Sequence, residues 1–415
     1  MTTANTDTPG RPARRKPVFL ITVTVLALAA VGTSAISKRA RPTLIAGPMV
    51  QIPAPDTLTI VWDVEALFAT GKVCLTGPDG MELVKTATAQ GTRCEVSFDG
   101  LKPGGEYTYT VSHSGFLWRD VQLAGPHETA APPPRGTPFR FIAFGDSGVG
   151  GNAQAALGEL VVEHNPDLFI HLGDLDQSTG LAKNYLPYFF EPYAVLLRSV
   201  PFLSVLGNHD SATDAGKALL DIFVLPRNGP EGIEPERNFY FDFGDARFVG
   251  LDTNRVAGKQ SGILTPEQMK NVVAPWLRQI LTDCDARWKF VYFHHPFYTG
   301  SNHPPEGAAY VKEAYVSVFE DCGVDMVFCG HNHLYERSAP ILRDKIVEDG
   351  RGVVYITSGT GGARRYAMNL PPPPYNRVYN DKLLGFVQVD LTTDKLVLKQ
   401  INERGDVFDE YVIEK

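Results

Sequence analysis

The 415-residue chain has only 5 cysteines, and no two of them form a CxxC pair. A zinc ribbon and a thioredoxin-type redox motif are therefore disfavoured. No lysine- or arginine-rich stripe runs through the body of the sequence and the formal net charge is -8, so nucleic-acid binding is disfavoured as well. Long disorder is excluded by 23 Phe, 16 Tyr and 4 Trp, and the 39 Gly and 31 Pro argue against a helical bundle.

The N-terminus has the pattern of a targeting segment. Residues 1–17 are polar and basic, and residues 18–36 then carry no charge. As a helix this run is barely long enough to cross the apolar core of a bilayer. Small residues permit cleavage after Ala35, whereas Lys38 and Arg39 directly beyond it favour an uncleaved membrane anchor. Both alternatives, with residues 1–41 as signal peptide or anchor, predict an extracytoplasmic protein that is secreted or anchored.

In an oxidising compartment the cysteines allow two disulfides, Cys74 with Cys94 and Cys284 with Cys322. Cys329 lies in an apolar stretch and is expected to be a buried free thiol. Five unpaired cysteines are the alternative.

Two domains are predicted, joined by a proline-rich connector. Residues 42–129 contain short alternating strands and turns, which indicate a small β-sandwich. Residues 130–137 include three consecutive prolines and form a stiff linker. Residues 138–415 alternate apolar strands with helical stretches, which predicts a layered α/β domain with ligands at the strand ends.

Five polar clusters follow apolar runs in this second domain. They are GDSG at 145–148, GDLD at 173–176, GNHD at 207–210, FHHP at 293–296 and GHNH at 330–333. A single cluster of this kind is an ordinary turn, but five at strand ends are improbable by chance. Asp, Asn and His without cysteine suit zinc, iron or manganese, and a carboxylate can bridge two such ions.

This ordered set of motifs resembles the calcineurin-like metallophosphoesterases, and more narrowly the purple acid phosphatases. The segments Tyr240–Phe243, Trp276–Leu277 and Gly330–Ser338 are also similar to the latter family. The resemblance implies a four-layer metallophosphoesterase β-sandwich flanked by helices, preceded by a small all-β fibronectin type III-like domain. It covers roughly residues 42 to 415.

The resemblance also implies the ligands of two divalent or trivalent metal ions. Asp146 and His333 would hold the first ion, Asp174 would bridge both, and the second ion would take Asn208, His294 and His331. A hydroxide between the ions would attack phosphorus in line.

Three further residues receive catalytic roles by motif position. His209 would face the phosphate, Asp210 could orient it, and His303 would protonate the leaving alcohol. The alternative for His303 is an exposed loop histidine. His295 is expected beside the ligands and not among them.

Two positions depart from the family pattern. Gln177 stands where the purple enzymes carry the tyrosine that binds ferric iron, and Gly148 stands where the wider superfamily carries a histidine. The first ion thus lacks one strong ligand, which water, Gln177 or Asp176 could replace. We predict weaker binding at this site and no tyrosinate-to-iron absorption.

The leading functional prediction is an exported phosphatase that hydrolyses small phosphomonoesters. The alternatives are a phosphodiesterase or nucleotidase of the same fold, and a non-catalytic surface binding protein. The residues expected to decide between the two enzymes are a substrate-facing set: Tyr298, His303, Tyr335 and Arg337.

Overall fold

The computed structural model describes residues 41–52, 56–65, 70–114, 120–254, 263–348 and 350–415. The predicted targeting segment at residues 18–36 lies outside the described residues. Within the described ranges, no helix has both the length and the apolar character needed to cross a membrane.

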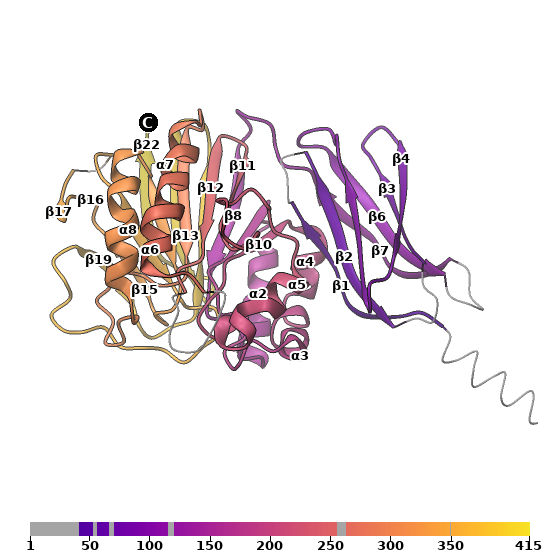
Figure 1. The fold of residues 1–415 in the computed structure, drawn as a ribbon, viewed down its shortest axis with the longest axis horizontal. Coiled ribbons are helices and arrows are strands. Elements are labelled where there is room, and N and C mark those ends of the chain that lie inside the picture. The colour runs from indigo at the N-terminus through magenta and orange to yellow at the C-terminus, as the bar shows by residue number, and fades with distance from the viewer. Residues whose placement is uncertain (1–40, 53–55, 66–69, 115–119, 255–262, 349) are drawn as a thin grey trace, which may run out of the picture.

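A small β-sandwich forms the N-terminal part of the described chain (Figure 1). Strands β1, β2 and β5 make one sheet, and the order β4-β3-β6-β7 makes the other. Their alternating residues face inward, as in β6, where Tyr107, Tyr109 and Val111 are buried. The strands are β1 (Thr43–Gln51), β2 (Leu58–Glu65), β3 (Thr70–Thr76), β4 (Glu82–Thr88), β5 (Arg93–Phe98), β6 (Glu106–Ser114) and β7 (Val121–Ala130).

Two larger sheets form the second part of the chain. The six-stranded sheet has the order β10-β9-β8-β20-β21-β22, and the seven-stranded sheet has the order β11-β12-β13-β14-β18-β15-β19. The first contains β8 (Phe139–Phe144), β9 (Leu168–His171), β10 (Phe202–Ser204), β20 (Gly385–Leu391), β21 (Lys395–Asn402) and β22 (Val407–Glu414). The second contains β11 (Phe239–Phe243), β12 (Ala246–Leu251), β13 (Trp288–Phe293), β14 (Met326–Cys329), β15 (Tyr335–Ser338), β18 (Val354–Ser358) and β19 (Asn376–Asn380). A separate hairpin pairs β16 (Ile341–Leu342) with β17 (Lys345–Ile346).

Helices cover the outer faces of both sheets, which gives the predicted four layers (Figure 1). Leu277 and Leu281 of α7 pack with Val291 and Phe293 of β13, and Val161 of α2 belongs to the core of the six-stranded sheet. The helices are α2 (Asn152–Glu163), α3 (Ala182–Tyr185), α4 (Ala194–Ser199), α5 (Lys217–Ile222), α6 (Pro266–Gln268), α7 (Ala274–Thr282) and α8 (Ala308–Asp321). Short 3-10 or π segments lie at Leu186–Phe190, Asp210–Ala212, Asp214–Gly216 and Met269–Val273.

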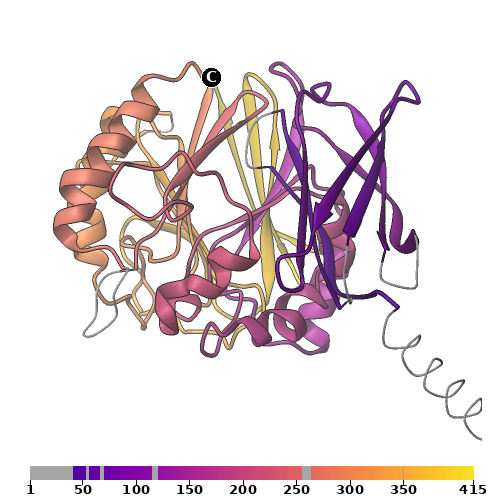
Figure 2. The same cartoon turned by 45° about the vertical axis from the view of Figure 1, so that its right-hand side comes forward.

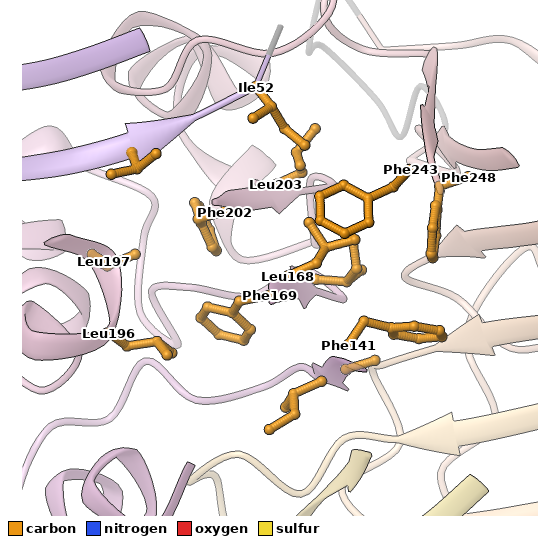
Figure 3. Packing of buried hydrophobic residues seen from close by; sticks show 14 of the residues in the cluster. Ile52, Phe141, Leu168, Phe169, Leu196, Leu197, Phe202, Leu203, Phe243 and Phe248 are labelled. Carbon is orange, nitrogen blue, oxygen red and sulfur yellow. The ribbon is translucent and has the colours of Figure 1, made fainter. Parts of the chain in front are cut away.

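Aromatic rings fill the space between the two sheets. Phe141 of β8 meets Phe248 of β12 edge to face at 5.1 Å, and its ring lies 5.3 Å from Phe290 and 5.7 Å from Phe328 (Figure 3). Each buried Phe stabilises the fold by about 1.5–3 kcal/mol relative to an exposed one. This cluster fixes the spacing of the two sheets, and therefore of the residues that follow their strands.

The sandwich lies against the larger domain at α4 (Figure 1), and the two parts are also side by side in the turned view (Figure 2). The Tyr109 hydroxyl donates to the Arg198 carbonyl at 2.7 Å, and Gln51 Oε1 accepts the Val224 amide at 2.6 Å. Figure 3 shows Ile52 beside Leu203 at this junction. The proline connector is also held, because the Pro132 carbonyl accepts the Gly104 amide at 2.8 Å. The sandwich is thus packed directly against the larger domain, in addition to being joined to it by the connector.

All five cysteines are free thiols, so neither of the two expected disulfides is formed. Cys94 instead lies 3.6 Å from His113 Nε2, and Cys322 lies 3.7 Å from the Thr282 hydroxyl. Cys329 is buried in β14, as expected.

Candidate metal centre

Polar side chains from both sheets meet where the parallel strands end. Asp146, Asp174 and Asn208 follow β8, β9 and β10 of one sheet, which run parallel. The histidines of the FHHP and GHNH motifs follow β13 and β14 of the other, which are also parallel. The carboxyl ends of parallel strands share one edge of a sheet, where ligands of such folds bind.

Three of these residues have a left-handed backbone. The φ angle is 61° at Asp146, 59° at Asp174 and 65° at His331. This conformation is rare for residues other than glycine, costs about 1–3 kcal/mol at each position and concentrates at functional sites. It turns each side chain sharply out of its strand and into the space between the sheets.

One group of donor atoms converges on Asn208. Its Oδ1 lies 3.1 Å from His294 Nε2 and 2.8 Å from His331 Nδ1, and His294 Nε2 lies 3.3 Å from Asp174 Oδ2. Ligand atoms held about 2.0–2.2 Å from one ion are separated by about 2.8–3.6 Å in tetrahedral or octahedral arrangements. The ligand atoms of His294, His295 and His331 lie within 4.8 Å of one another, as do those of Asp146, Asp174 and His294, so His294 belongs to both sets of residues that could hold an ion.

A second group of donors also reaches Asp174 Oδ2. Asp146 Oδ1 is 3.3 Å from His333 Nε2, and the Gln177 amide is 3.4 Å from both Asp146 Oδ1 and Asp174 Oδ2. A side-chain amide carries an acceptor oxygen as well as a donor nitrogen, so a half-turn of the Gln177 amide directs its oxygen toward an ion. Asp176 cannot serve in its place, because its carboxylate accepts hydrogen bonds from Ser178, Gly180 and neighbouring groups of its own loop.

Hydrogen bonds fix the orientation of two of the imidazoles. His294 Nδ1 donates to the Leu172 carbonyl at 2.8 Å, and His333 Nδ1 donates to the Arg364 carbonyl at 2.7 Å. The Nε2 lone pairs are therefore directed at the neighbouring carboxylates, as in metal-binding histidines. Burial opposes the charged form of His294, but the Asp174 carboxylate outweighs it and raises the pKa to about 9. A metal ion has to displace this proton when it binds.

Position 148 cannot carry the superfamily's histidine. A Cβ atom on Gly148 would lie 2.1 Å from the Leu175 carbonyl oxygen and 2.5 Å from the Asp176 Cα. The backbone of the second motif occupies the place where a side chain would begin. The histidine is thus excluded by packing, whereas Gln177 remains beside the first group.

Three further histidines of the motifs and the neighbouring loop, His209, His295 and His303, differ in their surroundings. The backbone amide of His209 donates to Asp174 Oδ1 at 2.9 Å, which holds that carboxylate beside the two groups. His303 is exposed and its ring lies 6.1 Å from that of His331. His295 Nδ1 pairs with the Thr253 hydroxyl at 2.8 Å, beside the rings of His294 and His331.

Asp210 is directed away from the place expected for a substrate. Its buried carboxylate accepts the backbone amides of Asp174, Leu175, Asp176 and Gly207 at 2.7 to 3.2 Å and the Tyr185 hydroxyl at 3.1 Å. Burial and the charge of Asp174 raise its pKa to about 7. These contacts tie the Asp174 turn to the Asn208 turn, and the catalytic role expected for Asp210 stays a prediction.

Most of the expected substrate-facing set is engaged elsewhere. The Tyr298 hydroxyl bonds Asp344, and both Tyr335 and Arg337 bond the buried carboxylate of Asp409. Only His303 of that set borders the two donor groups.

Sequence reasoning missed the loop that follows β18. Tyr366 stacks on His333 with ring centroids 4.0 Å apart, and its ring lies 4.6 Å from that of His303. The signal was present as the stretch TSGTGGARRY directly after an apolar run, because a glycine-rich strand end permits a close backbone approach.

Comparison with known proteins agrees with this geometry. Residues 139–335 match the model of the calcineurin-like phosphoesterase family. This region is therefore similar to the calcineurin-like phosphoesterase domain.

Similar curated proteins include purple acid phosphatases and a diesterase. Purple acid phosphatase 23 of Arabidopsis thaliana is 25% identical over 301 residues, which is 64% of this chain and 62% of that protein. A nucleotide pyrophosphatase/phosphodiesterase of Hordeum vulgare is 24% identical over 350 residues, which is 74% of this chain and 90% of that protein. The chain spans only 53% to 62% of the lengths of three Arabidopsis purple acid phosphatases that it matches.

Solved structures extend the likeness of fold to most of the chain. The purple acid phosphatase PPD1 from yellow lupin, Lupinus luteus, has a TM-score of 0.76 at 18% identity, covering 90% of this chain and 74% of that one. PhoD has a TM-score of 0.67 at 14% identity, covering 88% of this chain and 89% of that one.

Proposed function

We propose that the protein is an exported phosphatase with a binuclear metal centre that hydrolyses small phosphomonoesters. The observation that carries this proposal is the pair of donor groups that both reach one shared carboxylate, Asp174. We retain the division into residues 1–41, 42–129, 130–137 and 138–415, with a fibronectin type III-like sandwich and an extracytoplasmic location, as part of the same proposal.

The six proposed ligands divide between two ions. The first ion takes Asp146 and His333, the second takes Asn208, His294 and His331, and Asp174 contacts both. When bound, the ions activate a water molecule as nucleophile and neutralise the charge of the phosphate.

The surrounding residues would position the substrate and move one proton. The His209 amide contacts Asp174 and its Nδ1 lies 3.3 Å from the Ser178 carbonyl, which places the residue beside the site, and its ring is expected to face the phosphate. His303 is exposed beside His331 and Tyr366, a position that supports protonation of the leaving oxygen.

The proposed ions are divalent, such as zinc or manganese, or iron in its divalent state. The first group supplies a neutral amide at Gln177 in place of an anionic tyrosinate, so it offers less charge to a trivalent ion. Oxygen and nitrogen donors without sulfur suit all three metals.

A phosphodiesterase is the second candidate, since the barley relative that the chain covers most fully is named for that activity. A non-catalytic binding protein is less well supported, because both donor groups are present and fit metal ions.

The test combines metal content with activity. Purified protein is analysed for bound metal and assayed on p-nitrophenyl phosphate and bis(p-nitrophenyl) phosphate, beside Asn208→Ala and the exposed control Asn271→Ala. We expect two ions per chain, a preference for the monoester, and at least about a 100-fold loss of activity in Asn208→Ala only. A protein with one ion and no turnover of either ester with any added metal would refute the proposal.

A further inference from the structure

The loop after β18 covers the first donor group. The Ala363 amide donates to the Asp146 carbonyl at 2.9 Å, and the Tyr366 amide donates to the His333 carbonyl at 3.1 Å. The Arg364 carbonyl accepts from His333 Nδ1. Arg365 is therefore held between residues that touch both Asp146 and His333.

The side chain of Arg365 is only partly buried, but two of its guanidinium nitrogens lack a partner. Its Nε and Nη1 atoms are closed to solvent and have no hydrogen-bond acceptor among the described residues. A buried donor left unpaired costs about 1–3 kcal/mol, and more if it is charged. Burial lowers the pKa of Arg365 to about 10, so the group remains protonated at neutral pH.

The nearby carboxylates do not form hydrogen bonds with the Arg365 guanidinium. Asp146 and Glu403 are the carboxylates whose charge acts on Arg365, yet neither forms a hydrogen bond with it. Asp146 Oδ2 accepts the His331 amide at 2.7 Å, and its Oδ1 faces His333. Glu403 is exposed and accepts the Leu384 amide at 3.0 Å.

Metal binding would further reduce the negative charge available to neutralise the Arg365 guanidinium. Once an ion occupies the first group, the charge of Asp146 is shared with that ion. Gln177 adds no negative charge, because its amide is neutral. The side of the centre next to Asp146 thus carries an unpaired cation and lacks the anion that a tyrosinate would supply, so it favours an incoming anion.

We propose that Arg365 binds the phosphate group of the substrate and makes the site selective for phosphomonoester dianions over phosphodiester monoanions. This inference rests on the proposed phosphatase function and specifies its substrate class. A guanidinium directs several N–H donors at phosphate oxygens, and the terminal phosphate of a monoester offers one more charged oxygen than a diester.

The experiment compares full-length wild type, Arg365→Gln, Arg365→Lys and a control, Arg377→Gln, which removes an exposed arginine on β19. Each protein is loaded with Mn²⁺, its metal content is measured, and inorganic phosphate is titrated by calorimetry. The ratio of kcat/KM for p-nitrophenyl phosphate to that for its bis ester is then determined.

We expect Arg365→Gln to retain two ions while phosphate affinity and the monoester-to-diester ratio both fall about 10- to 100-fold. Arg365→Lys should recover part of both losses because it keeps the charge, and Arg377→Gln should match wild type. If Arg365→Gln does not fold, Arg365→Lys still tests the inference. It keeps the positive charge but loses the planar guanidinium, so phosphate affinity and the monoester-to-diester ratio should fall by a smaller factor.

The inference is overturned if Arg365→Gln binds phosphate as wild type does, if the ratio is unchanged, or if wild type binds no phosphate. Failure of the proposed function gives a different result. A wild-type protein that holds two ions and binds phosphate through Arg365, but hydrolyses neither ester, contradicts the phosphatase proposal alone.

Discussion

Replacement of Asp210 by alanine should damage both folding and metal binding, because one carboxylate organises two ligand turns. It accepts four backbone amides, three from residues 174–176 and one from Gly207, and also the Tyr185 hydroxyl. Its side chain is fully buried. Alanine leaves these five donors without an acceptor in the protein.

The magnitude follows from those five bonds. At about 1 kcal/mol for each unpaired buried donor, the lower end of the usual range, Asp210→Ala costs about 5 kcal/mol. That equals the whole stability of a marginal domain. Asp210→Asn keeps the shape and one acceptor oxygen, so it should lose about half as much. Tyr185→Phe removes a single donor and should cost about 1 kcal/mol.

Urea unfolding followed by tryptophan fluorescence measures the stabilities, and a Zn²⁺ titration of the metal-free proteins measures the affinities. We expect the affinity of Asp210→Asn to fall about 10- to 100-fold, because its turns carry Asp174 and Asn208. Tyr185→Phe should keep wild-type affinity. An Asp210→Ala protein that unfolds within about 1 kcal/mol of wild type and binds zinc normally would refute this reasoning.

Three further predictions concern single positions. Iron-loaded wild type should lack an intense visible band, whereas Gln177→Tyr should gain one in absorption spectra; a band in wild type contradicts the account of this site. Gly148→Ala should lose bound metal, since its Cβ would collide with the Leu175 carbonyl, and elemental analysis that finds two ions would disprove the clash. Burial lowers the pKa of His171 to about 3, so wild type should lose up to about 1.4 kcal/mol of stability per pH unit as pH falls from about 6.5 toward 3. His171→Phe should lose less over that range in urea unfolding; equal losses in the two proteins would show that His171 is not the cause.

The sequence was sufficient to predict the layered α/β domain and the polar motifs that follow its strands. The alternation of apolar strands and helices expected in residues 138–415 is present, for example in β8 (Phe139–Phe144), α2 (Asn152–Glu163) and β14 (Met326–Cys329). Such segments are buried, uninterrupted and ended by glycine, so local pattern and tertiary context agree.

The hydrogen bonds that the Asp210 carboxylate accepts from backbone amides could not be predicted from the sequence, and the reason is physical. Its neighbour Asn208 lies beside His294 and His331, and the backbone amide of His209 contacts Asp174, so adjacency in sequence suggested the same site for Asp210. A short 3-10 turn begins at Asp210 and directs its side chain to the opposite side, toward backbone amides of residues 174–176. Nearly every residue carries the same backbone N–H and C=O groups, so the sequence does not indicate which of them a side chain will contact. Such contacts can be identified only from the three-dimensional structure.

The two departures from the family pattern look equivalent in the sequence but differ in the structure. At Gly148 no side chain fits, because the chain at Leu175 and Asp176 already fills that space. At Gln177 a polar side chain still reaches Asp146 and Asp174. The first donor group therefore keeps its number of donors but loses negative charge. The neutral amide of Gln177 stands at the position of the tyrosinate of the purple enzymes. The charged side chain of Arg365 lies near Asp146 and has two unpaired nitrogens. Both differences act in the same direction, toward ions of lower charge and substrates of higher negative charge.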